Sequence, residues 1–368
     1  MAHPQVPPRT HLLPPIGSLI DVLEFPANQV VVGPPGSGKT VLALHAAHRA
    51  AQRGPVHFIV ASEHLVRWLR RQVHADEDIT VGTWRHWLNA EYGRQQRGGA
   101  LPMLDPTRRR IDWNAISPGG PVKAANTCAA IGQVIVDEAQ DVPIQLIRHI
   151  HSWGYAVLAL ADPVQRYTDE GSELEDLVDA IADADPWPVF VLEQDYRTTR
   201  PIQTLATRSW APQRADPSRP AGRDGSPPTI RRSTLDAVLQ EVEAAFARGH
   251  GTSTVVATSH ADRVEVVARL QAAAIPVRRS NDDGDDGAAG VQVLPFEALR
   301  GLEFDSVVLV LPEAGSHEHD DALRLRAHLY VAATRARQHL SVVVRPTVSS
   351  ELQHGLDDSA RTDVGAGA

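Results

Sequence analysis

The chain of 368 residues has a single cysteine, only two lysines and no long apolar run. One cysteine, Cys128, excludes an internal disulfide framework and a zinc site built from cysteines, and we expect it to be a small buried hydrophobic residue. The longest apolar runs, such as 157–161 and 307–311, are far shorter than the roughly 18 residues that cross a bilayer. The N-terminus also lacks a basic stretch followed by an apolar one. We therefore expect a cytoplasmic protein without membrane contact.

Excess positive charge is also absent, since the formal net charge is −9. A protein of this charge does not attract nucleic acid through bulk electrostatics, so any such function needs a local basic face. The two lysines are Lys39 and Lys123, and the other 34 of the 36 Lys and Arg residues are arginine. In every other respect the composition is that of a globular protein with material for about two domains.

Strand-length apolar runs alternate with helical patterns along most of the chain. This alternation predicts mostly parallel sheets covered by helices on both faces, which is an α/β fold. The expected strands are at residues 28–32, 56–61, 133–136, 156–161, 189–192, 254–258, 292–294 and 307–311, and the expected helices are at 41–52, 234–248, 261–274 and 323–334.

Two stretches of biased composition help to divide the chain. Residues 211–228 are nearly all proline, glycine and charged or small polar residues, and residues 281–290 read NDDGDDGAAG. Both compositions are typical of solvated, flexible loops. The expected organisation is a disordered lead at 1–15, a first domain at 16–190, a second domain at 191–350 that contains both loops, and a disordered tail at 351–368.

The strongest local motif is GPPGSGKT at residues 33–40, between an expected strand and an expected helix. It fits the phosphate loop G-x-x-x-x-G-K-[ST] in its usual context. Glycines let backbone N–H groups turn towards the phosphates, the helix N-terminus adds its dipole, and a lysine reaches the terminal phosphates. The Thr40 hydroxyl is expected to bind Mg²⁺. The expected nucleotide-binding residues here are Gly33, Pro34, Pro35, Gly36, Ser37, Gly38, Lys39 and Thr40.

A second motif, QVIVDEAQD at 133–141, is an apolar strand that ends in two adjacent carboxylates. In phosphate-loop NTPases the first acid at such a strand end holds Mg²⁺ through water, and a second acid polarises the attacking water. Asp137 fits the first role and Glu138 the second. An acidic pair alone is also typical of a solvated strand end. The catalytic interpretation of Asp137 and Glu138 therefore depends on the phosphate loop in the same chain.

Four further stretches follow in a fixed order: ADPVQRY at 161–167, LEQDYRTTRPI at 192–202, RGLEF at 300–304 and HLYVAATRARQHL at 328–340. Together with the first two motifs, this series resembles the superfamily 1 helicases of the UvrD/Rep type. The resemblance implies two RecA-like phosphate-loop NTPase domains that use ATP and Mg²⁺, and it makes Lys39 and Glu138 catalytic.

The resemblance also implies roles for residues of the later motifs. Gln165 would sense the γ-phosphate, Arg197 would contact it, and Arg335 would be the arginine finger. Tyr196 would stack near the base, while Gly301 and Glu303 would lie near phosphate and ribose. Arginines of this kind stabilise the transition state of phosphoryl transfer. Because Arg197 and Arg335 belong to the second expected domain, hydrolysis would require domain closure.

Nucleic-acid contacts are implied by ITVGTWRHWLNAEY at 79–92, which resembles a DNA-contacting segment of the family. By this match Thr83 touches a phosphate and Trp84 offers its ring to a base, and Ser62 matches a further phosphate contact. Stacking on an aromatic ring is worth about 1–3 kcal/mol per base. The alternative is that the tryptophans of this segment, including Trp87, fill the core under a helix.

The chain departs from the family in several places. Family members are commonly about twice as long, because each motor domain carries a large helical insertion. The family's base-stacking tryptophan after the motif at 161–167 falls at Glu170. Its threonine and histidine before the motif at 300–304 fall at Pro295 and Glu297. Its asparagine before the Tyr-Arg pair of the motif at 192–202 is Asp195. These changes leave the ATPase residues intact and weaken the expected DNA track.

Two functions follow as hypotheses. The first is an ATP-driven translocase or helicase in DNA repair or defence that steps along single-stranded DNA, with 3′ to 5′ polarity; RNA as the track stays open. The second is an ATP-hydrolysing switch or assembly subunit that recruits a nuclease or another protein without processive unwinding. The lost track contacts and the missing insertions are the reasons for the second hypothesis, and the first is the main expectation.

Overall fold

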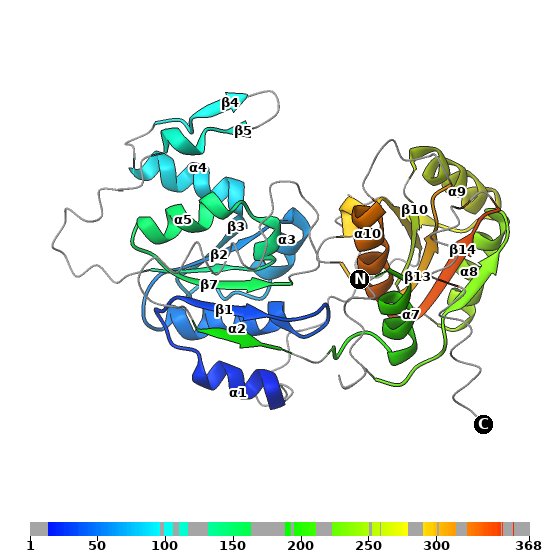
Figure 1. Cartoon of the computed structure of the whole chain (residues 1–368), viewed down its shortest axis with the longest axis horizontal. Coiled ribbons are helices and arrows are strands. Elements are labelled where there is room, and N and C mark those ends of the chain that lie inside the picture. Colours follow the sequence, from blue (N-terminus) through cyan, green and yellow to red (C-terminus); the bar gives the residue numbers. More distant parts are fainter. Residues whose placement is uncertain are drawn as a thin grey trace. The chain divides into compact units, whose positions relative to one another are not determined.

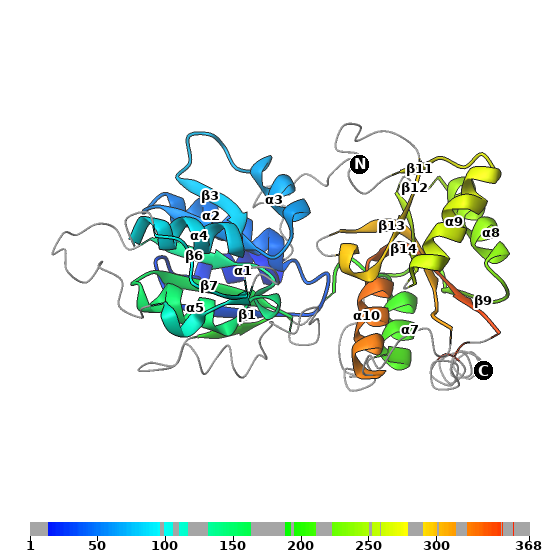
Figure 2. The same ribbon diagram turned by 90° about the horizontal axis from the view of Figure 1, so that it is seen from above.

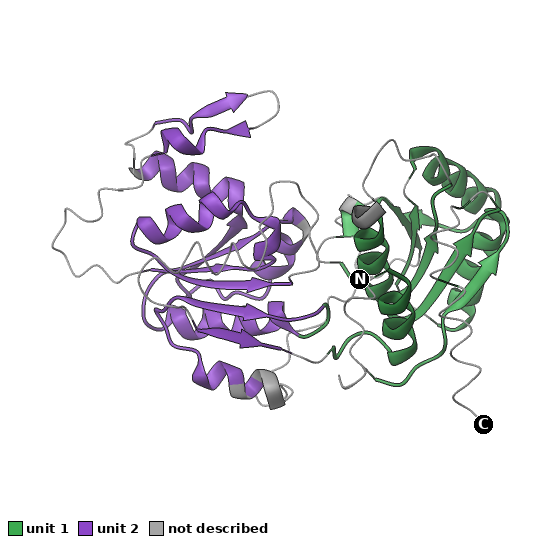
Figure 3. Ribbon diagram, viewed as in Figure 1, with its two compact units in different colours: residues 1–4, 35–37, 194–368 green, residues 5–34, 38–193 purple. Residues whose placement is uncertain are grey.

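In the computed structural model, the described residues are 14–95, 99–105, 110–116, 132–162, 188–192, 195–210, 223–249, 252–257, 259–278, 290–299, 302–313, 322–346, 348 and 356. The chain forms two compact units (Figure 3). Unit 1 comprises residues 1–4, 35–37 and 194–368, and unit 2 comprises residues 5–34 and 38–193. None of the helices in the described ranges combines the length and apolar character that a membrane crossing requires.

Unit 2 is built on a six-stranded sheet in the order β3-β2-β6-β7-β1-β8, in which every pair is parallel. The buried strands are short runs of β-branched and other apolar residues, as expected for a sheet covered on both faces. Their bounds are β1 (Gln29–Val32), β2 (Val56–Val60), β3 (Ile79–Thr83), β6 (Gln133–Val136), β7 (Ala156–Ala161) and β8 (Val189–Val191).

Helices cover both faces of this sheet (Figure 1). One hydrophobic core lies under α1 (Pro14–Val22), α2 (Lys39–Ala51) and α3 (Glu63–Arg70). A second core lies under α4 (Trp84–Gln95) and α5 (Ile144–Ser152). The same second core receives side chains from a small extension made of β4 (Met103–Asp105), β5 (Arg110–Ile111) and η2 (Trp113–Ala115).

Unit 1 contains a second six-stranded parallel sheet, in the order β11-β12-β10-β13-β14-β9. Its helices lie in two pairs, with α8 and α9 on one face and α7 and α10 on the other (Figure 2). The bounds are α7 (Arg200–Trp210), β9 (Thr229–Arg232), α8 (Asp236–Ala247), β10 (Ser253–Ala257), α9 (His260–Ala272), β11 (Val277–Arg278), β12 (Val291–Leu294), η6 (Phe296–Leu299), β13 (Phe304–Val310), α10 (Ala322–Thr334) and β14 (Ala336–Val344). The expected α/β class with two parallel sheets is confirmed.

Some expected boundaries need correction. Residues expected to be a lead or loop are ordered at their edges: α1 begins at Pro14, and Arg223 forms a parallel bridge with Thr199. Leu356, inside the expected disordered tail, is fully buried. The two units divide at residues 193/194, three residues after the expected boundary at 190/191. The expectations for residues 1–13, 211–222, 281–289 and most of the tail lie outside the described residues.

Parallel strands bring their carboxyl ends to one edge of the sheet, and ligands bind at such an edge in α/β proteins. In unit 2, Gly33 follows β1, Asp137 follows β6 and Asp162 follows β7, while Thr83 ends β3 and Ser62 lies two residues beyond β2. The edge therefore collects the phosphate loop, the acidic pair and the expected nucleic-acid contacts. The fold itself brings together residues that lie more than a hundred positions apart.

Candidate functional site

The phosphate loop is a tight turn between β1 and α2. Gly36 and Gly38 have positive φ angles of 73° and 87°, which only glycine adopts without strain. A Cβ at Gly36 would also lie 2.0 Å from an oxygen of Asp195, which belongs to unit 1 together with Gly36. Both glycines are therefore required by backbone geometry.

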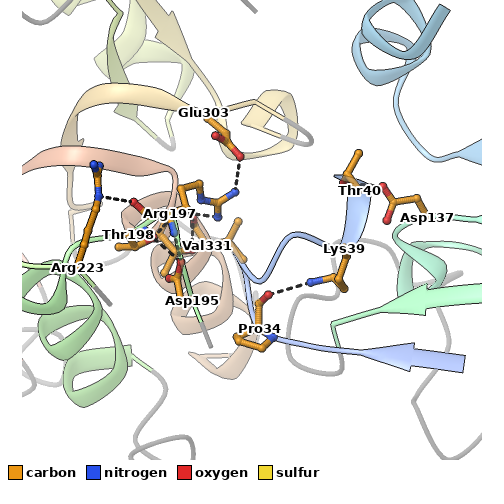
Figure 4. Close-up of polar contacts among 11 residues, drawn as sticks. Pro34, Lys39, Thr40, Asp137, Asp195, Arg197, Thr198, Arg223, Glu303 and Val331 are labelled. Atoms are coloured by element: carbon orange, nitrogen blue, oxygen red, sulfur yellow. Dashed lines mark hydrogen bonds and ion pairs between the residues drawn. The ribbon is translucent and has the colours of Figure 1, made fainter. Parts of the chain in front are cut away.

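Lys39, the first residue of α2, is buried and lies back across the loop (Figure 4). Its Nζ donates hydrogen bonds to the carbonyl oxygens of Gly33 at 2.8 Å and Pro34 at 3.0 Å. The Ser37 hydroxyl is completely buried and has no hydrogen-bond partner among the described residues. Phosphate oxygens are the acceptors that such an ammonium group and hydroxyl take, so the loop is suited to bind a polyphosphate.

Thr40 and Asp137 form the candidate cation site. The Thr40 hydroxyl donates to Oδ2 of Asp137 at 2.7 Å, although the two residues are 97 positions apart. Burial, together with the neighbouring Glu138, raises the pKa of Asp137 to about 7. A divalent cation next to Asp137 would favour its ionised form. Hydroxyl and carboxylate oxygens are also the ligands that Mg²⁺ prefers. The donor set therefore fits Mg²⁺, with Thr40 and Asp137 as the residues that would hold it.

Glu138 stands in a strained backbone conformation beside this pair. Its φ of 55° places a non-glycine residue in the left-handed region, which costs about 1 kcal/mol or more and is common at functional sites. Gln140 donates from Nε2 to the Glu138 carboxylate at 2.5 Å, and its Oε1 accepts from the backbone N–H of Asp162 at 2.9 Å. The amide of Gln140 thus links the acid after β6 to the end of β7 and fixes the Glu138 side chain.

In unit 1, Arg197 is held by two acceptors. Its Nη1 donates to Glu303 at 2.8 Å, and its Nη2 donates to the backbone carbonyl of Thr334 at 2.9 Å. Burial raises the pKa of Glu303, but the guanidinium groups of Arg197, Arg335 and Arg337 outweigh this effect and hold the pKa below its usual value. Three arginines therefore favour the ionised form of this carboxylate, and Arg197 contacts it directly.

Asp195 organises the turn that carries Arg197. Its buried carboxylate accepts the backbone N–H groups of Arg197 at 2.8 Å and Thr198 at 3.0 Å. The backbone N–H of Tyr196 donates to the carbonyl of Gly36 at 3.0 Å. Burial raises the pKa of Asp195, although Arg197 and the two N–H groups oppose that effect. The aspartate thus caps this turn where the family has asparagine, and base stacking by Tyr196 stays a prediction.

The expected nucleic-acid contacts lie at the β2 and β3 end of the edge. Ser62 is the N-cap residue of α3, and its side chain makes no capping hydrogen bond. The Thr83 hydroxyl oxygen accepts the backbone N–H of His86 at 3.4 Å. Thr83 ends β3 and Ser62 lies two residues beyond β2, so both lie at the sheet edge where ligands bind in α/β proteins. Their contact with nucleic acid stays a prediction.

Trp84 does not have the exposure expected of a base-stacking ring. It is 6% exposed, and Trp113 stacks on it with ring centroids 6.5 Å apart. The guanidinium carbon of Arg85 lies 4.2 Å from the centroid of the Trp84 ring. Trp87 is equally buried and contacts the aromatic residues around it, as the core interpretation predicts. Because Trp84 belongs to the core under α4, the expectation that it offers its ring to a base is not supported by this geometry.

The site contains residues that no sequence motif predicts, and two of the expected site residues lie outside the described ranges. Arg223 contacts the backbone of the Arg197 turn, yet it lies in a stretch interpreted as a loop, and no motif marked it. The carbonyl of Thr334 is a ligand of Arg197 that no side-chain pattern reveals. Gln165 and Gly301 lie outside the described residues.

Comparison with known proteins gives one family match. Residues 293–343 match the model of the UvrD-like helicase C-terminal domain. This stretch includes Glu303 and Arg335, so the helicase resemblance of the later motifs is confirmed for this part of the chain. Among curated proteins none matches the chain.

Solved helicase structures are similar at low sequence identity. The C-terminal domain of a possible DNA helicase from Lactobacillus plantarum WCFS1 is 21% identical with a TM-score of 0.34, covering 43% of this chain and 92% of that one. The PRRSV helicase is 17% identical with a TM-score of 0.44, covering 86% of this chain and 52% of that one. An arterivirus nonstructural protein 10 helicase, solved with DNA, is 15% identical with a TM-score of 0.47, covering 90% and 63%. The chain thus spans between 52% and 63% of the two viral helicases.

Proposed function

We propose that the chain, which carries a UvrD-like helicase C-terminal segment, is an ATP-hydrolysing motor that acts on single-stranded DNA. The observation that carries the proposal is the arrangement at the sheet edge of unit 2. There a phosphate loop with its lysine, the Thr40–Asp137 pair and Glu138 come together in one place. This is the set of groups that phosphoryl transfer from a nucleoside triphosphate to water requires.

In this proposal the phosphate loop binds the β- and γ-phosphates, and Lys39 moves its ammonium group from the loop carbonyls to phosphate oxygens. Thr40 and Asp137 would hold Mg²⁺, which would neutralise charge on the triphosphate. Glu138 accepts a proton from the attacking water, and Gln140 keeps its carboxylate oriented. A general base in this role contributes about 10²- to 10⁴-fold to the rate.

Arg197 and Arg335 supply positive charge to the γ-phosphate as it is transferred. The loose transition state spreads negative charge over three oxygens, so a positioned guanidinium stabilises it more than the ground state. Arg197 forms an ion pair with Glu303 at 2.8 Å. During turnover the γ-phosphate would replace Glu303 as the acceptor of Arg197, and Glu303 would turn to the ribose.

Single-stranded DNA is the proposed track, with Ser62 and Thr83 as phosphate contacts and 3′ to 5′ polarity as the proposed direction. A motor must grip its track with different strength in different nucleotide states, because the coupling between the two ligands is reciprocal. The net charge of −9 makes this binding dependent on a local basic face and sensitive to salt.

We expect the dissociation constant for a labelled single-stranded oligonucleotide to change at least about fivefold between nucleotide-free, ADP-bound and ATP-analogue-bound protein. Fluorescence anisotropy at several salt concentrations measures it. The Lys39→Ala variant is the control, and it should show one affinity under all three conditions. Equal affinity in every state of the wild-type protein would contradict a motor.

The second candidate is an ATP-hydrolysing switch that recruits a nuclease or another protein in repair or defence. The burial of Trp84 favours it, because the expected base-stacking ring is part of the core. A strand-displacement assay on a partial duplex separates the two functions. Unwinding by the chain alone excludes the switch, whereas ATP hydrolysis with no displacement supports it.

A further inference from the structure

Arg223 joins two backbone segments of unit 1 through a single guanidinium group. Its Nε donates to the carbonyl oxygen of Arg197 at 3.1 Å (Figure 4). Its Nη2 donates to the carbonyl oxygen of Arg337. Arg337 follows Arg335 by two residues at the start of β14. One side chain therefore connects the turn that carries Arg197 to the segment that carries Arg335.

These contacts close a ring. Arg197 reaches the carbonyl of Thr334 with its own Nη2 at 2.9 Å, and the chain runs from Thr334 through Arg335 to Arg337. Arg223 then returns from the carbonyl of Arg337 to that of Arg197. A closed ring restrains the Arg197 backbone more strongly than either contact alone, since the turn cannot shift without breaking a charge-assisted hydrogen bond.

The backbone around Arg223 is itself anchored to this turn. The carbonyl oxygen of Arg223 accepts the N–H of Arg200 at 2.8 Å, and Arg223 forms a parallel bridge with Thr199. Gly225 packs so closely on Thr199 that an added Cβ would lie 2.3 Å from its methyl carbon. The guanidinium of Arg223 is thus delivered from a fixed position, although its side chain is exposed.

We propose that Arg223 is a positioning residue for phosphoryl transfer, which sets the placement of Arg197 relative to Arg335. The proposal rests on the proposed function, because it assigns both arginines to the transferred phosphate. A planar guanidinium presents two donors at a fixed angle, and this geometry lets it bind both carbonyls at once. The ammonium group of lysine lacks that fork, and glutamine lacks the length.

The test uses Arg223→Gln and Arg223→Lys in the full chain, with ATP hydrolysis measured over a range of ATP concentrations. Both variants should lose about tenfold in kcat, which corresponds to about 1.4 kcal/mol, with KM within about twofold of wild type. Affinity for the ADP–aluminium fluoride complex should fall about tenfold, while affinity for ADP stays within about twofold. A general loss of structure would instead weaken both ligands and lower the Tm.

Arg200→Gln is the matched control, because it removes an exposed arginine at the start of α7 whose side chain pairs with Asp224 at 3.2 Å, a residue 93% exposed. It should leave kcat and KM unchanged. In an Arg197→Lys background, Arg223→Gln should lower kcat by less than about twofold, since Arg223 acts through Arg197.

The outcomes separate this inference from the proposed function. A tenfold loss that is the same in both Arg197 backgrounds would overturn the positioning role, as would Arg223→Gln behaving like Arg200→Gln. Wild-type protein that neither hydrolyses ATP nor prefers ADP–aluminium fluoride over ADP would overturn the proposed function, and the inference with it. If the wild-type protein hydrolyses ATP and prefers ADP–aluminium fluoride over ADP, the kinetics of the Arg223 variants decide whether the positioning role is correct.

Discussion

Replacing Lys39 with alanine is expected to lower ATP hydrolysis at least about 100-fold. Its ammonium group lies in the phosphate loop, 2.8 Å and 3.0 Å from the carbonyls of Gly33 and Pro34. A bound triphosphate brings several negative charges to this position, and no second lysine or arginine belongs to the loop. The substitution removes charge from both the ground state and the transition state, so nucleotide affinity should fall together with kcat.

Lys123→Ala is the matched control for this substitution, because Lys123 is the other lysine in the chain. Steady-state phosphate release and the affinity for a fluorescent ATP analogue measure the two effects. The control should retain wild-type activity. A Lys39→Ala protein with near-normal hydrolysis would show that the phosphate loop does not bind the reacting nucleotide.

Glu138→Gln is expected to lower kcat by at least about 100-fold while ATP still binds with near-normal affinity. Glutamine preserves the shape of the side chain and can still contact Gln140, but it cannot accept the proton of the attacking water. The neighbouring Asp137 keeps its contact with Thr40 at 2.7 Å, so the cation site should survive. The variant should therefore accumulate in an ATP-bound state.

Glu265→Gln provides a control of the same chemistry at an exposed ion pair with Arg269. Single-turnover hydrolysis and equilibrium binding of ATP distinguish chemistry from binding. The control should match wild type in both measurements. If Glu138→Gln instead weakened ATP binding and left the single-turnover rate unchanged, the carboxylate would be a structural group and not the general base.

Patterns within short stretches of the sequence are sufficient to predict much of the fold. Residues 133–136 and 156–161 were expected as strands, and they are β6 and β7 with the same bounds. Such runs are easily predicted because all their residues except Gln133 are apolar and polar or turn-forming residues follow or precede them. By contrast, β14 was not expected, because α10 ends at Thr334 and β14 begins at Ala336 with only Arg335 between them. No glycine or proline marks that change of structure.

In the site, too, residues that form a local motif can be predicted, whereas residues that act through long-range contacts cannot. The phosphate loop and the Asp137–Glu138 pair could be predicted, because their chemistry requires particular residues at a particular spacing. The role of Arg223 could not, since its partners are backbone carbonyls, which every residue has. The burial of Trp84 depends on Trp113, which comes from the small extension after α4, and the order of residues gives no sign of that contact.

The most direct test of the proposed motor is the steady-state ATPase rate of the purified chain, measured with increasing single-stranded DNA. Duplex DNA and single-stranded RNA are the comparison ligands, and a salt titration reports the number of phosphate contacts. The account predicts hydrolysis that rises severalfold with single-stranded DNA, saturates, and weakens as salt increases. A rate that does not change with any of the three nucleic acids would contradict it.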